Sequence, residues 1–296
     1  MLPFQVSIQY HARVWGGQRL KASPKNPIGE AWIVHEHNQI QNGEFAGQTL
    51  EWLTQNHAQE LLGRNATRFP LLIKILDCAD WLSIQVHPND TQAVQLEGLG
   101  QLGKTEAWHL LEVENGAELI CGVKDGVSST QLETAIRTGK VIDVAQYQSV
   151  QSGETVMMHA GTMHALGPGM LLYEVQQTSD ITYRVYDWGR PASAGRALHI
   201  EQAVAVTKTN RAEVTPRLER GVLTECPYFV LEKINQPMQR QTANSFHAIT
   251  VTEGTAQLEC AGQTWTLGRF DSLIVPASAE AYQMRGAFEA LLSRLP

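Results

Sequence analysis

The sequence predicts a mainly β protein made of two β-rich blocks with a few peripheral helices. Three observations support this fold class. Short apolar and alternating runs follow one another along the chain, Gly, Pro and Asn interrupt them at short intervals, and helical periodicity is confined to three segments. Many short strands with turn signals between them are typical of jelly-roll barrels and β-sandwiches.

Composition limits the classes of protein that fit. The chain has 296 residues, of which 43% are hydrophobic, enough to bury one sizeable core or two smaller ones. A formal net charge of -7 argues against non-specific nucleic-acid binding, which needs a basic surface, but allows an anionic small substrate. No stretch is apolar for long enough to span a membrane, so we expect neither a nucleic-acid nor a membrane partner.

The cysteines and the N-terminus indicate the compartment. The four cysteines form no C-x-x-C pair, which in a chain of this length is the pattern of reduced, buried thiols. The N-terminal residues lack the basic head and apolar run of a signal peptide. We therefore expect a protein of the cytoplasm.

The first block contains nine expected strands. Each is a run of four to eight residues rich in Val, Ile, Leu or aromatic side chains and bounded by turn residues. They cover residues 6–10, 31–35, 71–76, 82–86, 106–113, 118–121, 155–158, 171–175 and 182–186.

Three segments of this block carry helical signals. Residues 49–62 and 199–208 have apolar side chains at helical spacing. Residues 130–137 begin with an expected capping box of Thr130 and Glu133. These helices are too few to form a layer on each face of a sheet, so we expect them at the periphery.

A second β block follows the polar, aperiodic segment 209–221. Its turns are expected at Glu253-Gly254 and Ala261-Gly262. We therefore expect a first domain over residues 1–208 and a smaller one over residues 209–296. The strands expected in the second block are 228–234, 246–251, 256–260, 264–267 and 272–275.

The strand expected at residues 82–86 leads directly into a histidine. Because side chains alternate along a strand, Ser83, Gln85 and His87 share one face, while the apolar residues between them share the other. A row of hydroxyl, amide and imidazole is costly to bury unless it borders water, a ligand or a metal. An ordinary polar outer face would show the same pattern.

The strand that begins near Glu106 also places polar side chains on one face. Lys104, Glu106 and Trp108 point to one side by the same alternation, and His109 points to the other. A lone Lys-x-Glu is usually a solvated surface pair. Here it opens an apolar strand, which favours partial burial.

Two further histidines flank a glycine turn, His159 and His164. Together, His87, Glu106 and His164 supply two imidazoles and one carboxylate, with Gln85 as a fourth candidate ligand. A catalytic zinc ion is typically held by three protein ligands with one position left open. The sequence therefore predicts a metal site at the mouth of the first barrel.

At this point the sequence resembles the mannose-6-phosphate isomerase family, in its compact bacterial form. The resemblance covers nearly the whole chain in order, and several of its segments are long enough to be specific. These segments are 15–17, 28–32, 83–90, 103–108, 160–166, Glu174, 179–184, 226–229 and 271–277.

The resemblance implies an enzyme that interconverts mannose 6-phosphate and fructose 6-phosphate, built from two cupin-like jelly-roll barrels. It implies one zinc ion per chain. We expect this ion in the first barrel only, because His247 is the only histidine of the C-terminal block. The ligands it implies are Gln85, His87, Glu106 and His164. The residues it places in the sugar-phosphate pocket are Ser83, Lys104, Glu174 and Arg184.

One position departs from the family. Proline usually precedes the Ala-Gly-Thr turn, and this chain has His159 there. The Gly-Thr-x-His-Ala frame nevertheless favours His164 as the ligand.

The chemistry of isomerisation suggests catalytic roles without ranking them. Glu174 is a candidate base, while Lys104 and Arg184 are candidates for stabilising an oxyanion or the phosphate. The alternative for Arg184 is a surface ion pair with Asp180 or Asp187.

Other functions fit part of the pattern. The main alternative is a metal-binding cupin that acts on another sugar, or only binds one. An iron cupin that uses oxygen is a further alternative, because two histidines and a carboxylate can form a facial triad. The cations Lys104 and Arg184 favour a phosphorylated substrate over this last option.

Overall fold

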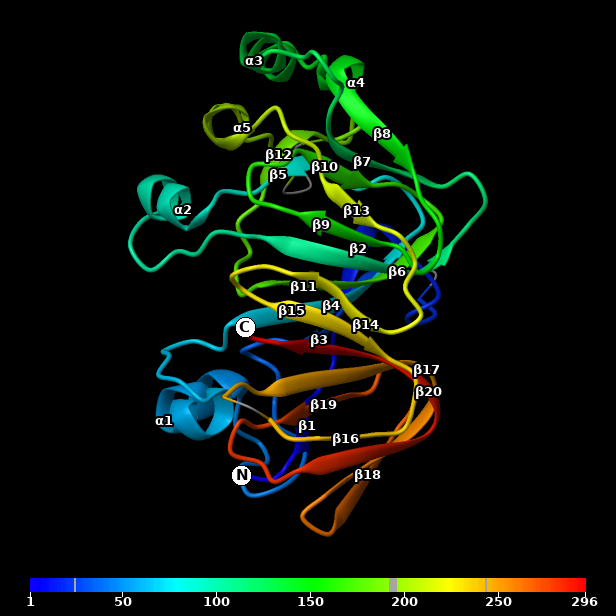
Figure 1. The fold of residues 1–296 in the computed structure, drawn as a ribbon. Coiled ribbons are helices and arrows are strands. Elements are labelled where there is room, and N and C mark those ends of the chain that lie inside the picture. Colours follow the sequence, from blue (N-terminus) through cyan, green and yellow to red (C-terminus); the bar gives the residue numbers. More distant parts are fainter. Residues whose placement is uncertain (24, 192–195, 243) are drawn as a thin grey trace. The chain divides into compact units, whose positions relative to one another are not determined.

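The structure is a computed structural model that describes residues 1–23, 25–191, 196–242 and 244–296, and it is mainly β with few helices (Figure 1). In these ranges the helices are α1 (Leu50–Leu62), α2 (Asp90–Glu97), α3 (Ser129–Arg137), α4 (Val141–Val144) and α5 (Ile200–Val206). The strands up to α5 are β1 (Phe4–Gln5), β2 (Gln9–Gly17), β3 (Ile28–Val34), β4 (Leu71–Cys78), β5 (Ile84–Val86), β6 (Glu106–Val113), β7 (Glu118–Val123), β8 (Ala145–Ser149), β9 (Thr155–Met158), β10 (His164–Leu166), β11 (Met170–Gln177) and β12 (Tyr183–Tyr186). Those after it are β13 (Glu213–Thr215), β14 (Gly221–Glu225), β15 (Val230–Ile234), β16 (Met238–Arg240), β17 (His247–Cys260), β18 (Gln263–Leu267), β19 (Ser272–Val275) and β20 (Tyr282–Arg294).

Two compact units divide the chain. Unit 1 comprises residues 1–10, 31–75 and 217–296, and unit 2 comprises residues 11–30 and 76–216. A division of the sequence after residue 208 therefore differs from the division in space. The reason is visible at the N-terminus, where β1 pairs with β19, so that an N-terminal strand completes a sheet made mostly of C-terminal residues.

Unit 2 contains two facing sheets. In the described residues, the five-stranded sheet has the order β12-β5-β10-β7-β8, and the sheet opposite it contains β13, β9, β6 and β11 as consecutive neighbours. Alternate residues of both sheets point inward and form one apolar core, with Trp108, Leu119, Leu166 and Leu172 among its members. The site described below lies between these two sheets.

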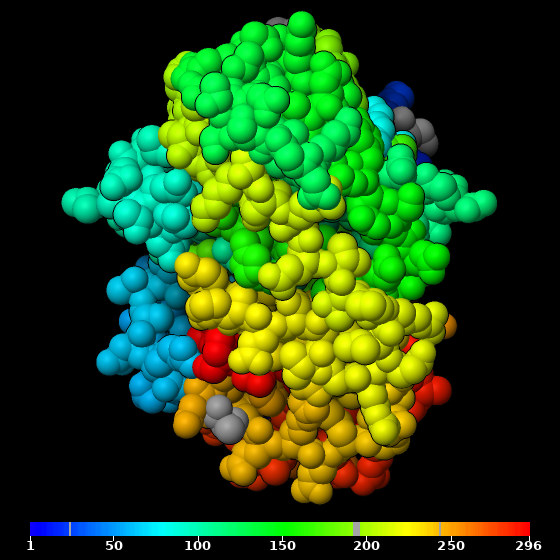
Figure 2. Space-filling view, turned by 45° about the horizontal axis from the view of Figure 1, so that its top comes forward, coloured from blue at the N-terminus to red at the C-terminus, as the bar shows by residue number. Residues whose placement is uncertain are grey.

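Helices cover the outer face of the five-stranded sheet. Ile84 and Val86 of β5 pack there against Leu132 of α3 and Ala203 of α5. Figure 1 shows α3, α4 and α5 beyond this sheet, and the green atoms of the segment carrying α3 and α4 form the upper surface in Figure 2. Unit 2 is thus layered as helices, sheet and sheet.

Unit 1 is built around two long strands. Within the described residues its eight-stranded sheet follows the path β1-β19-β17-β20-β15-β14, with β18 paired to β17 and β16 paired to β20. Inward-facing residues of β17, β18, β19 and β20 form its core, which includes Leu258, Trp265, Leu273 and Met284. Helix α1 belongs to this unit and is capped by Thr49 and Gly63 at its two ends.

Several expected elements have the predicted bounds, and others do not. Strands β6, β9 and β19 are confirmed residue for residue. The turn expected at Glu253-Gly254 is wrong, because β17 continues through it with a bulge between Val251 and Glu253. The capping box of α3 is formed by Ser128 and Gln131, not by Thr130 and Glu133.

The strand expected at residues 6–10 is also wrong in its bounds. Val6 forms only an isolated bridge with Ile40, and the two true strands, β1 and β2, lie on either side of it.

No helix in the described part of the chain combines the length and apolar character needed to cross a membrane.

Candidate metal centre

Three neighbouring strands of the five-stranded sheet place polar side chains in one row. Gln85 of β5 lies opposite His164 of β10 on one side and opposite Arg184 of β12 on the other. Residues directly opposite each other in antiparallel strands project to the same face of the sheet. Gln85, His164 and Arg184 therefore form a row across three strands.

This row faces the interior between the two sheets. The neighbours of Gln85 and Arg184 along their strands, Ile84, Val86, Tyr183 and Val185, belong to the apolar cluster on the helix-covered outer face. By alternation the row must project to the opposite, inner face.

The opposing sheet contributes a carboxylate. Glu106 begins β6 and lies opposite Gln176 of β11 and Met158 of β9. Trp108, two residues further along, belongs to the inner core, so Glu106 shares the inward direction. His109 points the other way, where its Nδ1 is 2.9 Å from Thr155 Oγ1. The predicted alternation of this strand is confirmed.

Three side chains converge in this interior. One donor atom from each of His87, Glu106 and His164 lies within 4.8 Å of the others, and all three residues are buried. Nε2 of His164 is 3.3 Å from Glu106 Oε1, and Nε2 of His87 is 3.6 Å from Glu106 Oε2. Among the described residues, this is the group of histidine, cysteine and acidic side chains with the spacing of a metal site.

Hydrogen bonds fix the orientation of both imidazoles. His87 Nδ1 is 2.8 Å from the carbonyl oxygen of Ile181, and His164 Nδ1 is 2.8 Å from that of Thr162. A carbonyl oxygen only accepts, so each Nδ1 carries the proton, and in a neutral ring Nε2 is then the acceptor nitrogen. Such bonds to the second nitrogen are typical of metal-binding histidines.

The charge state of His164 supports a cation at this point. Burial, as the main cause, lowers the pKa of His164 to about 4, so the ring is neutral near pH 7. Its short distance to Glu106 is therefore not an ion pair but an approach of two acceptors. Two imidazole lone pairs and a carboxylate directed at one point are stabilised by a metal ion, and these donors suit zinc.

Lys104 and Gln85 border this group. Lys104 Nζ is 3.1 Å from Glu106 Oε2, and the lysine side chain is buried. A Cβ atom on the preceding Gly103 would lie 2.5 Å from the backbone of Asn89, so glycine lets the chain pass close to the start of α2. The amide of Gln85 is 3.3 Å from His164 Nε2 and would present its oxygen to a metal after rotation of the amide group.

Glu174 lies on the same inner face of the opposing sheet as Trp108. It pairs with Trp108 across β11 and β6, and its Oε2 accepts a hydrogen bond of 3.1 Å from the indole Nε1. Its carboxylate is buried, and its negative charge acts to raise the pKa of His164, against the larger effect of burial. Ser83 is buried directly before β5.

Arg184 is half-buried, and its guanidinium has an N–H group that can donate a further hydrogen bond. Its Nη1 donates to the carbonyl oxygen of Ala197 at 3.0 Å, while its buried Nε–H has no hydrogen-bond partner among the described residues. Among the described residues Arg184 forms no ion pair with Asp180 or Asp187, and Asp187 accepts hydrogen bonds from Arg190 and Arg196. Burial lowers the pKa of the Arg184 guanidinium.

Two other histidines lie elsewhere. His159 is 46% exposed, with Nε2 at 3.8 Å from Glu213 Oε1, and takes no part in the converging group. His247 is in unit 1, where its Nδ1 is 2.7 Å from the Tyr282 hydroxyl. The backbone carbonyls that orient His87 and His164 could not be read from the sequence, because a carbonyl leaves no residue-type signal.

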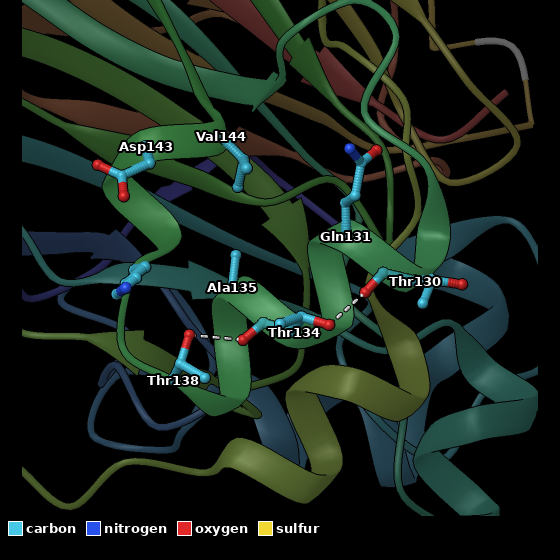
Figure 3. A pocket seen from close by; sticks show the side chains of 8 residues that line it. Thr130, Gln131, Thr134, Ala135, Thr138, Asp143 and Val144 are labelled. Atoms are coloured by element: carbon cyan, nitrogen blue, oxygen red, sulfur yellow. Dashed lines mark hydrogen bonds between the residues drawn. The ribbon is translucent and has the colours of Figure 1, made fainter.

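The pocket in Figure 3 is separate from this centre. It has a volume of about 300 Å³ and is lined by residues of α3 and α4 and their surroundings. Thr134 and Thr138 donate their hydroxyl protons to backbone carbonyls one turn earlier, so mainly apolar surface remains. This pocket lacks the grouped donors that catalysis requires.

Comparisons with known proteins agree on one family. A family model described as the catalytic domain of type I phosphomannose isomerase matches residues 4–108. The mannose-6-phosphate isomerase of Streptococcus mutans is 35% identical, over 98% of this chain and 98% of that protein. The mannose-6-phosphate isomerase ManA of Bacillus subtilis is 33% identical, over 97% and 96%. A crystal structure of mannose 6-phosphate isomerase from Bacillus subtilis has a TM-score of 0.88 at 31% identity, covering 99% of both chains.

Proposed function

The chain belongs to the type I phosphomannose isomerase family, and we propose that it interconverts mannose 6-phosphate and fructose 6-phosphate with the aid of one zinc ion. The observation that carries the proposal is the buried convergence of His87, Glu106 and His164 beside two cationic side chains, Lys104 and Arg184. We propose Gln85 as the fourth ligand.

Aldose–ketose interconversion moves a proton between two adjacent carbons through an enediol-like intermediate. When bound, zinc supplies Lewis-acid polarisation of the substrate oxygens. Glu174 is proposed to take and return the proton, because its buried carboxylate lies on the inner face and is oriented by Trp108. Lys104 and Arg184 are proposed to stabilise oxyanion or phosphate charge, and Ser83 to contact the sugar phosphate.

The arrangement of the fold is part of the proposal. We propose that each unit contains a cupin-like jelly-roll barrel. We assign the metal to the catalytic part within residues 1–208, and no metal to the C-terminal part within residues 209–296, where His247 is bonded to Tyr282. The four cysteines are free and buried, which supports a reducing cytoplasm as the location.

Metal removal tests the function. The purified protein should contain about one zinc ion per chain and convert mannose 6-phosphate in a coupled assay. Exhaustive chelation should abolish turnover, and added zinc should restore it, because the ligands remain in place. Full activity of a protein shown to be free of metal would contradict the proposal.

Proton exchange tests the assignment of Glu174 as the base against the electrostatic role proposed for Lys104. With substrate in deuterated water, the Glu174→Gln variant should keep its metal yet lose exchange of the substrate proton with solvent. The Lys104→Gln variant should still exchange, though turnover falls, because its role is electrostatic. If only the lysine variant loses exchange, Lys104 is the base.

A further inference from the structure

Arg184 lies on a strand with an open edge. β12 is the outermost strand of the five-stranded sheet, so in the part of the chain that the structure describes no strand pairs with its other side. Edge strands present unpaired N–H and C=O groups, which must find other partners. At Arg184 both groups are satisfied by a single residue, His199.

The two bonds resemble those of a missing strand. The backbone N–H of Arg184 donates to His199 Nδ1 at 3.1 Å, and the backbone N–H of His199 donates to the carbonyl oxygen of Arg184 at 2.8 Å. The guanidinium donates to Ala197, two residues before His199. The segment 197–199 therefore contacts both the backbone and the side chain of Arg184.

The side chain of His199 bonds to Arg184 and does not cap the helix that His199 precedes. It is the N-cap residue of α5, but its side chain makes no capping hydrogen bond. Its backbone angles, φ -118° and ψ 60°, differ from the extended ones of the N-cap residues Asn89 and Ser128, whose side chains do cap their helices. The imidazole is directed instead to the amide of Arg184, as a neutral ring with an unprotonated Nδ1. Burial and the nearby Arg184 lower the pKa of His199 and thereby favour this neutral form.

Helix α5 gives His199 a rigid base. Ala203 and Val206 are buried in the apolar cluster on the outer face of the five-stranded sheet, together with Tyr183 and Val185 of β12. The imidazole of His199 also lies beside the ring of Tyr183, with centroids 6.2 Å apart. His199 thus directly precedes a helix that is packed on the sheet, and its ring has Tyr183 of β12 as a neighbour.

We propose that His199 is a positioning residue that holds β12 so that Arg184 projects into the row with Gln85 and His164. The proposal rests on the proposed function only through the role of Arg184 in turnover. A guanidinium displaced by about 1 Å loses alignment with the charge it stabilises, and such a displacement can reduce turnover by up to about a hundredfold.

The test uses three substitutions in the full-length, metal-loaded protein with mannose 6-phosphate. His199→Ala and His199→Gln should reduce kcat by about tenfold, since neither places an acceptor at the Nδ1 position. His199→Asn should restore kcat to near the parent value, because its side-chain oxygen occupies that position. Metal content should be unchanged in all three.

A double mutant separates positioning from general stability. Arg184→Ala with His199→Ala should be no slower than Arg184→Ala alone, because His199 acts only through Arg184. Ser128→Ala is the matched control, since it removes the N-cap of α3, another helix in the same apolar cluster. It should lower the melting temperature and leave kcat unchanged.

The outcomes are distinct. Parent-like kcat in His199→Ala, an asparagine variant as slow as alanine, or additive losses in the double mutant would each overturn the positioning role. A parent protein that binds zinc but does not convert mannose 6-phosphate would overturn the proposed function instead.

Discussion

Replacing His164 by alanine should remove the metal and nearly all turnover, whereas replacing His159 should leave both almost intact. His164 Nε2 lies within the converging group, 3.3 Å from Glu106 Oε1, while His159 lies at the surface beside Glu213. A Lewis acid contributes several kcal/mol to transition-state stabilisation, so its loss should reduce turnover by roughly a thousandfold or more. The two histidines are five residues apart in one segment, which makes them a matched pair.

Metal analysis and kinetics on the same preparations check this result. Each variant should be tested by circular dichroism and thermal melting, because His164 is buried and alanine leaves a cavity there. A folded His164→Ala protein that keeps one zinc ion per chain would show that His164 is not a ligand. Loss of zinc in His159→Ala alone would assign the ligand to the other histidine.

Alternation along a single strand is the part of the site that the sequence could predict. It placed Glu106 with Trp108 and His109 on the opposite side, and the structure has this arrangement. This succeeds because the period of two is a property of the strand itself. Strand order is different, since it depends on contacts between residues far apart in sequence. No local pattern shows that Gln85 lies between His164 and Arg184.

Several strands, among them short and interrupted ones, were not revealed by the sequence patterns. β10 has three residues and begins at His164, directly after a glycine turn, so it is too short for alternation to be seen. β20 has thirteen residues but contains Gly286 with a positive φ of 122°, a residue that suggests a turn. In both cases pairing with neighbouring strands overrides the local signal.

The sequence contains a signal for one helix, α2, that was not among the expected helices. Asn89 and Gln92 form a capping box at the start of α2, and their spacing is visible in the sequence. The role of His199 could not be found in this way, because its side chain points back to a strand and leaves α5 without a side-chain cap. His199 is not a residue type expected at a helix N-cap, and the reason is that its side chain bonds to another element, β12.

Arg184→Ala should fold, keep its zinc and lose turnover by about a hundredfold or more, the usual effect of removing one preorganised donor from an active site. Arg184 shares the inner face with Gln85 and His164, is half-buried, and has an Nε–H without a hydrogen-bond partner among the described residues. An oxygen of the substrate would accept from this group. An exposed ion pair would instead change stability by at most about 1 kcal/mol, without a kinetic effect.

Kinetic constants then assign the role of Arg184. A fall in kcat alone indicates stabilisation of the transition state, while a rise in KM alone indicates binding of the phosphate in both states. Arg184→Lys keeps the charge but not the planar fork, so partial recovery would show that charge matters more than geometry. Arg137→Ala is the control, because Arg137 is an arginine of the protein surface whose ion pairs with Glu133 and Glu201 are exposed. If Arg184→Ala converts mannose 6-phosphate as fast as the parent and the Arg137 control, then Arg184 is structural. The row across β12, β5 and β10 would then contribute only its proposed ligands, Gln85 and His164, to the site.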